Sequence, residues 1–269
     1  MRTSIGSGKA CACAVILALA ASTAQAWEPA QDMAAQQVLR DARQDASAGR
    51  LAEAAEKHLW FHQHVLEREP SMEGVRLSFA MHDWVALARR YPPAMAQLIA
   101  VRDSTVTRID AGGMAGKQAL NEVISINNYM HAPESTRDAF NRLLQRDPVV
   151  AERSTPDVLP ALIELNDIEL ASKHLRVDEE LNRVERFYGH IKALKSSLPA
   201  DQVEDMKRWQ QRHVDIQLAR VAYVLCKDRR EADAERVVAR GRALLDPDAS
   251  VHHMTEALRC IAPPNDGEG

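Results

Sequence analysis

The stretch from Ala34 to Pro70 constrains the fold more than any other part of the chain, because it has the pattern of two antiparallel helices. Apolar residues recur three and four positions apart in 34–48 and again in 51–68, which is the spacing of an amphipathic helix. Gly49 lies between the two segments, where a helix commonly ends in a left-handed residue, and Pro70 stops the second helix. We therefore predict a helical hairpin here.

The rest of the chain continues this pattern, so the sequence predicts an all-α protein of about ten to twelve helices. No turn dipeptide lies between alternating β-branched residues, which is the pattern of a β-hairpin. Pro93 and Pro133 are placed to open helices, and Gly112-Gly113 to end one. The helix that follows Pro93 carries Arg102 at a position where its apolar stripe should continue.

Proline spacing divides the chain into regions. Pro148, Pro156 and Pro160 fall within thirty residues, and proline in a helix interior removes a backbone donor and clashes with the preceding turn. We therefore expect 27–147 to form N-terminal helical hairpins and 148–176 a seam of irregular short helices. Beyond the seam, we expect C-terminal hairpins over 177–262 and a disordered tail over 263–269.

Residues 1–26 have the pattern of a cleaved signal peptide. Arg2 and Lys9 precede an apolar run over 10–21, which is too short to span a bilayer, and Ala24-Gln25-Ala26 is a small-x-small cleavage site. We expect cleavage after Ala26 and a periplasmic or secreted product with no membrane span.

The mature chain is acidic. Removal of Arg2 and Lys9 leaves 32 of the 34 basic residues against 38 acidic ones, a net charge of −6. Without a basic cluster, such a chain is a poor ligand for nucleic acid or for anionic membranes. We expect a protein or peptide as its partner.

Two cysteines, Cys226 and Cys260, remain in the mature chain. An oxidising compartment and an even count favour a disulfide, which would join the last helices. The alternative is two buried free thiols.

The hairpin Gln37–Pro70 resembles a tetratricopeptide repeat. The resemblance rests on the turn Ala48-Gly49-Arg50-Leu51, on the small residues Ala54 and Ala55, and on the bulky Phe61 ahead of the terminating proline. It implies a helical-hairpin solenoid, a TPR-like superhelix that presents a concave face to partners. It implies no reaction.

Two groups of residues combine aromatic side chains with arginine, the residue types that supply most interface energy. Either they bind the partner, or their aromatic rings are core and their arginines are a solvated face. The first interpretation predicts a partner-binding surface made of Trp84, Arg89, Arg90, Tyr91, Arg183, Arg186 and Tyr188.

His58 and His62 lie four residues apart on one predicted helix, so both imidazoles could reach one metal ion, with His82 as a third ligand. The alternative is two buried histidines with hydrogen bonds inside the hairpin. No catalytic nucleophile motif and no cofactor motif stands out. The sequence therefore favours an exported interaction or scaffold protein that is not an enzyme, with a metal-binding protein or metal-dependent enzyme as the second hypothesis.

Overall fold

The computed structural model describes residues 27–194 and 199–264, and all regular secondary structure in these ranges is helical. The predicted signal peptide and residues 265–269 of the predicted tail lie outside the described residues. The thirteen α-helices of the described ranges are α1 (Ala35–Ser47), α2 (Leu51–Arg68), α3 (Glu73–Leu77), α4 (Phe79–Ala88), α5 (Pro92–Arg108), α6 (Gly113–Met130), α7 (Pro133–Arg146), α8 (Pro148–Glu164), α9 (Ile168–His174), α10 (Val177–Leu194), α11 (Ala200–Lys227), α12 (Glu231–Leu244) and α13 (His252–Ala257).

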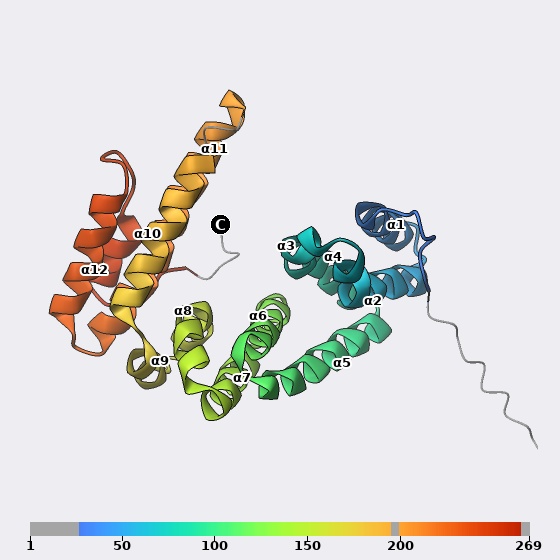
Figure 1. Ribbon diagram of the computed structural model, residues 1–269, viewed down its shortest axis with the longest axis horizontal. Helices are drawn as coiled ribbons and strands as arrows, with labels where there is room; N and C mark the ends of the chain where they lie inside the picture. Colours follow the sequence, from blue (N-terminus) through green and yellow to red (C-terminus); the bar gives the residue numbers. More distant parts are fainter. Residues whose placement is uncertain (1–26, 195–198, 265–269) are drawn as a thin grey trace, which may run out of the picture.

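Two short 3-10 turns, η1 (Pro70–Met72) and η2 (Ile109–Ala111), connect α2 to α3 and α5 to α6. The helices follow one another along an arc, with α1 to α4 in one arm and α10 to α12 in the other (Figure 1). Helices that pack extensively on each other are neighbours in the chain or at most three positions apart in helix order. Most of the packing is therefore between elements close in sequence.

One hairpin turn recurs along the chain. In each copy a residue with positive φ follows the helix, and the next backbone N–H donates to the carbonyl five residues earlier, which is the Schellman arrangement. Gly49 provides the positive φ after α1, as predicted, but the other copies use residues with side chains. The five bonds run from Arg50 to Asp45 (2.9 Å), Ala132 to Asn127 (3.0 Å), Asp167 to Leu162 (2.8 Å), Arg230 to Leu225 (2.8 Å) and Ile261 to Glu256 (3.2 Å).

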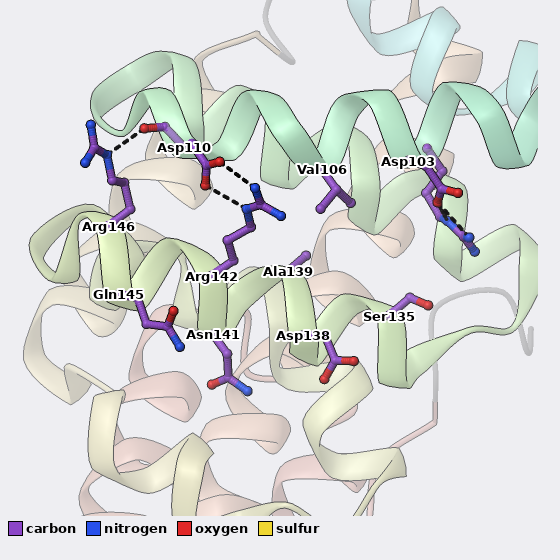
Figure 2. A pocket seen from close by; sticks show the side chains of 11 residues that line it. Asp103, Val106, Asp110, Ser135, Asp138, Ala139, Asn141, Arg142, Gln145 and Arg146 are labelled. Carbon is purple, nitrogen blue, oxygen red and sulfur yellow. Dashed lines mark hydrogen bonds and ion pairs between the residues drawn. The ribbon is translucent and has the colours of Figure 1, made fainter.

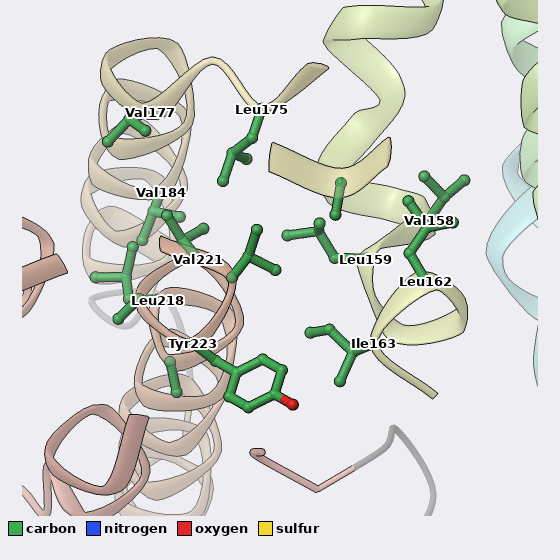
Figure 3. Packing of buried hydrophobic residues seen from close by; sticks show 14 of the residues in the cluster. Val158, Leu159, Leu162, Ile163, Leu175, Val177, Val184, Leu218, Val221 and Tyr223 are labelled. Carbon is green, nitrogen blue, oxygen red and sulfur yellow. The ribbon is translucent and has the colours of Figure 1, made fainter. Parts of the chain in front are cut away.

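The buried hydrophobic residues form three successive clusters. The first joins α1 to α2, with Val38 and Phe61 among its members, and the second joins α2, α4, α5 and α6 around Trp84. The third and largest extends from Ile109 to Ala257. Figure 3 shows its centre, where side chains of α8, α10 and α11 meet. Apolar residues all round the end of α11 explain its burial on several sides.

The predicted seam of short helices over 148–176 is wrong for its first half. Residues 148–164 form one continuous helix, α8, which runs through Pro156 and Pro160. The two prolines lie one turn apart, so the backbone bonds that they remove are on the same side of the helix. Proline in a helix interior costs about 3 kcal/mol. Here α8 packs on α7, α9 and α11, and this burial offsets the cost.

The expected count of ten to twelve helices is also too low. The chain between η1 and α5 forms two helices, α3 and α4, which are divided at Ser78, where φ is −125° and ψ is −93°. Such dihedrals lie outside the helical region, so the chain changes direction there. The hydroxyl of Ser78 donates to the carbonyl of Gly74 at 2.6 Å.

The last three helices are held together closely. A Cβ atom on Gly241 would lie 2.5 Å from the sulfur of Met254 and 2.8 Å from a methyl group of Leu218, so any larger residue here would have to displace the ends of these two side chains. The structure also pairs Cys226 with Cys260, joining the end of α11 to the segment after α13. None of the described helices is long and apolar enough to cross a membrane.

Candidate functional site

A groove of about 700 Å³ lies between α5 and α7. The two helices are joined through α6, and both pack on it, so they lie near each other on its surface. Val106 from α5 and Ala139 from α7 are the apolar residues of the groove, and Figure 2 shows them between its two polar ends. The groove therefore combines an apolar middle with polar ends.

The polar lining of the groove carries both charges in equal number. Three arginines (Arg102, Arg142 and Arg146) and three aspartates (Asp103, Asp110 and Asp138) line it. The hydrogen bond from Arg142, with Nε 2.6 Å from Oδ1, keeps the pKa of Asp110 below its ordinary value. Arg146 Nε donates to the carbonyl of Asp110 at 2.6 Å, and Figure 2 shows Asp110 above these two arginines at one end of the groove.

Amide side chains border the groove. Asn141 and Gln145 lie on the side of α7 that faces away from α5 in Figure 2. Neither side chain has a hydrogen bond to another residue in the described parts of the chain. Since an amide both donates and accepts, these groups can bind the backbone of an extended peptide.

A buried ionic cluster lies on the other side of α5. It is centred on Glu122 of α6, which is 5% exposed, and its partners come from α2, α3 and α5. Oε2 of Glu122 accepts from Nη2 of Arg76 at 3.0 Å. Oε1 accepts from Thr105 Oγ1 at 2.8 Å, Arg108 Nη2 at 2.7 Å and His62 Nε2 at 3.1 Å. The cluster thus joins four helices through one carboxylate.

Glu122 is ionised in this environment. Burial by itself raises the pKa of a carboxyl group, but the hydrogen bond from His62 and the charge of Arg76 outweigh it and hold the pKa of Glu122 well below its ordinary value. Nε2 of His62 lies 3.1 Å from Oε1 of Glu122 and 3.2 Å from Nη1 of Arg76, so a neutral ring donates to Glu122 in one tautomer and accepts from Arg76 in the other. Burial lowers the pKa of His62, so the ring stays neutral.

The histidines predicted as metal ligands have other roles. His58 stacks on Trp84 with ring centroids 6.4 Å apart, and His62 lies tilted against the same ring at 5.7 Å. The side chain of His82 is 69% exposed and contacts Tyr129 and Asp83. The structure therefore does not join the three into one site. The described residues contain no group of three or more His, Cys, Asp or Glu placed to hold a metal ion.

The residues predicted to bind a partner separate into core and surface. Trp84 and Tyr188 are buried, so these two rings are core and cannot contact a partner. Arg183 donates two hydrogen bonds of 2.6 Å to the carboxylate of Glu180, and Arg90 donates one of 2.7 Å to the carbonyl of Ala46.

The remaining members lie on the surface. Arg89 and Arg186 are exposed, and Tyr91 is half-buried at the start of α5. The groups on α4–α5 and on α10 belong to opposite arms of the arc in Figure 1, so they do not form one surface.

The groove and the buried cluster contain residues that were not predicted as site residues, but the sequence carries weak signals of two of them. Arg102, which interrupts the apolar stripe of its helix, lines the groove. Glu122 lies three residues after Ala119 and four before Ile126, both buried, so it is on the apolar face of α6. Nothing local shows that Arg76, 46 residues away, is its partner.

No family model, no curated protein and no solved structure matches this chain. The function therefore has to be inferred from the geometry of the groove and of the buried cluster.

Acid should destabilise the protein through His58. Burial lowers the pKa of this imidazole to about 4, from 6.5, although Asp83 opposes the shift and Arg43 adds to it. Between these values the unfolded chain binds a proton that the folded chain does not, so the free energy of unfolding falls as the pH falls from 6.5 to 4. The loss is roughly 3 kcal/mol by linkage.

The measurement is urea unfolding at pH 7, 5.5 and 4.5 for the wild type and for His58→Phe, which keeps an aromatic ring beside Trp84. We expect the free energy of unfolding of the variant to fall less steeply as the pH falls. The difference between the two slopes should correspond to about one bound proton. Equal slopes in the two proteins would show that His58 is not the group responsible.

Proposed function

We propose that this chain is an exported, TPR-like helical-hairpin protein that serves as an interaction module and binds an extended segment of a partner protein. The recurring hairpin turn supports a solenoid of helical hairpins, since one connection joins several helix pairs. Packing between helices close in sequence supports it further. The Cys226–Cys260 disulfide suits a periplasmic or secreted protein, because such bonds persist in oxidising compartments.

We place the binding site in the groove between α5 and α7. The observation that carries this choice is an apolar middle between charged ends of both signs, bordered by free amides. A peptide segment matches this surface, because its backbone donates and accepts hydrogen bonds and a side chain can cover the half-buried Val106. We prefer this site to a continuous concave wall, since the aromatic residues expected to line the wall, Trp84 and Tyr188, are buried.

Site-specific photo-crosslinking in the exporting cell tests the proposal. A photoreactive phenylalanine derivative replaces Gln145, which borders the groove, or Glu134, an exposed residue of the same helix that does not line it. We expect discrete adducts from position 145, few from position 134, and loss of the adducts when Arg142→Glu reverses a charge in the groove. Equal labelling at both positions, or adducts that survive Arg142→Glu, would place the partner elsewhere.

A further inference from the structure

A second hollow, of about 520 Å³, lies on the other side of α5 from the groove. Residues of α2, α3 and α6 line it together with the end of α5. Its volume is within the range of pockets that hold small organic molecules, about 300–1,000 Å³. The side chains of Arg76 and Glu122 reach this pocket, so its floor carries buried charged groups, whereas the charged residues of the peptide groove are not buried.

The floor of the pocket has more donors than acceptors. Both oxygens of Glu122 are already bonded, to Arg76 on one side and to Arg108, Thr105 and His62 on the other. Arg76 Nε is buried and has no hydrogen-bond partner within the described residues. The bonds of Arg108 use Nη2, which leaves its Nε and Nη1 for a ligand.

The charges of the cluster also favour a ligand that accepts hydrogen bonds. Two guanidinium groups, those of Arg76 and Arg108, share the single carboxylate of Glu122, and the His62 ring is neutral, so the floor carries one excess positive charge. Glu73 also lines the pocket, and since it is exposed like Arg108, water and salt screen both of these charges. The unbonded N–H groups of Arg76 and Arg108 are therefore what favours a ligand with oxygen acceptors.

The walls are partly apolar. The pocket is lined by Leu66, Pro70, Ala111, Ala115 and Ala119, together with the polar side chains of Thr107 and Gln118. A ligand that buries a hydrocarbon body gains about 25 cal/mol for each Å² removed from water.

We propose that this pocket binds a small aliphatic monocarboxylate. Its carboxylate accepts from the free N–H groups of Arg108, whose side chain is 58% exposed at the pocket, and its hydrocarbon chain packs along Leu66 and the alanines of α6. The site is separate from the peptide groove, since the two hollows share no lining residue. It therefore adds a small-molecule ligand to a protein that we otherwise propose to bind peptides.

Isothermal titration with sodium octanoate tests this, with 1-octanol and octylamine as probes of the same hydrocarbon length. We expect octanoate to bind at one site and at least tenfold more tightly than either probe. Arg108→Gln removes the free guanidinium, and Ala115→Leu fills the wall without changing a charge. Each should weaken octanoate binding at least tenfold, whereas Ala100→Leu, on an exposed part of α5 outside the pocket, should leave it unchanged.

Ala115→Leu decides the result if Arg108→Gln weakens the fold, because Ala115 is exposed and has no part in the cluster. No octanoate binding would overturn the proposal. So would equal affinity for octanol, or octanoate binding that survives both substitutions in folded protein.

Discussion

Replacing Glu122 with glutamine should lower the free energy of unfolding by about 3–5 kcal/mol, the usual loss when one partner of a buried ion pair is removed. The variant leaves the guanidinium of Arg76, 8% exposed, without a compensating charge. It also weakens the connection between α6 and the three other helices that contribute to the cluster. Urea unfolding followed by circular dichroism at pH 7 measures the effect.

Glu185→Gln is the matched control. Glu185 also forms two bonds with an arginine, Arg240, at 2.5 and 2.9 Å, but this pair lies on the surface between α10 and α12. Exposed pairs contribute at most about 1 kcal/mol. If Glu122→Gln shifted the urea midpoint no more than Glu185→Gln, the cluster would not be a main source of stability.

Loss of the Cys226–Cys260 disulfide should destabilise the protein by about 3–4 kcal/mol. The bond closes a loop with a sequence separation of 34, so its removal returns conformational freedom to the unfolded chain. The closed loop contains the whole of α12 and α13, and both of these helices pack on α11.

Unfolding of the wild type with and without a reductant gives the magnitude. The double variant Cys226→Ser/Cys260→Ser provides the control, because it should match the reduced wild type and should not respond to the reductant. A reduced wild type as stable as the oxidised one would show that helix packing alone holds this end of the chain.

Local sequence patterns predicted the helix boundaries well where residues close in sequence determine them. Apolar spacing with Gly49 and Pro70 predicted α1 and α2 to within one or two residues. The other four Schellman turns were missed because His131, Asn166, Arg229 and Cys260 have positive φ without being glycine. A residue with a side chain is strained in this conformation, so no sequence pattern indicates that it will adopt a positive φ.

The groove and the cluster were hardly predictable. Their residues come from helices whose spacing depends on how α6 packs between α5 and α7, and the visible signs were a charged residue within an apolar stripe at Arg102 and at Glu122. The histidine pair was correctly placed on one helix, but its surroundings could not be known, since Glu122 lies 60 residues from His62.

The sequence by itself determined the helical class, most helix boundaries and the amphipathic faces, because each depends on residues within a few turns of one another. Only the tertiary structure decided that α8 continues through two prolines, that Trp84 and Tyr188 are core, that Cys226 meets Cys260, and that one carboxylate joins four helices. Each of these outcomes depends on burial between segments distant in sequence, and burial outweighs local preference when the two conflict.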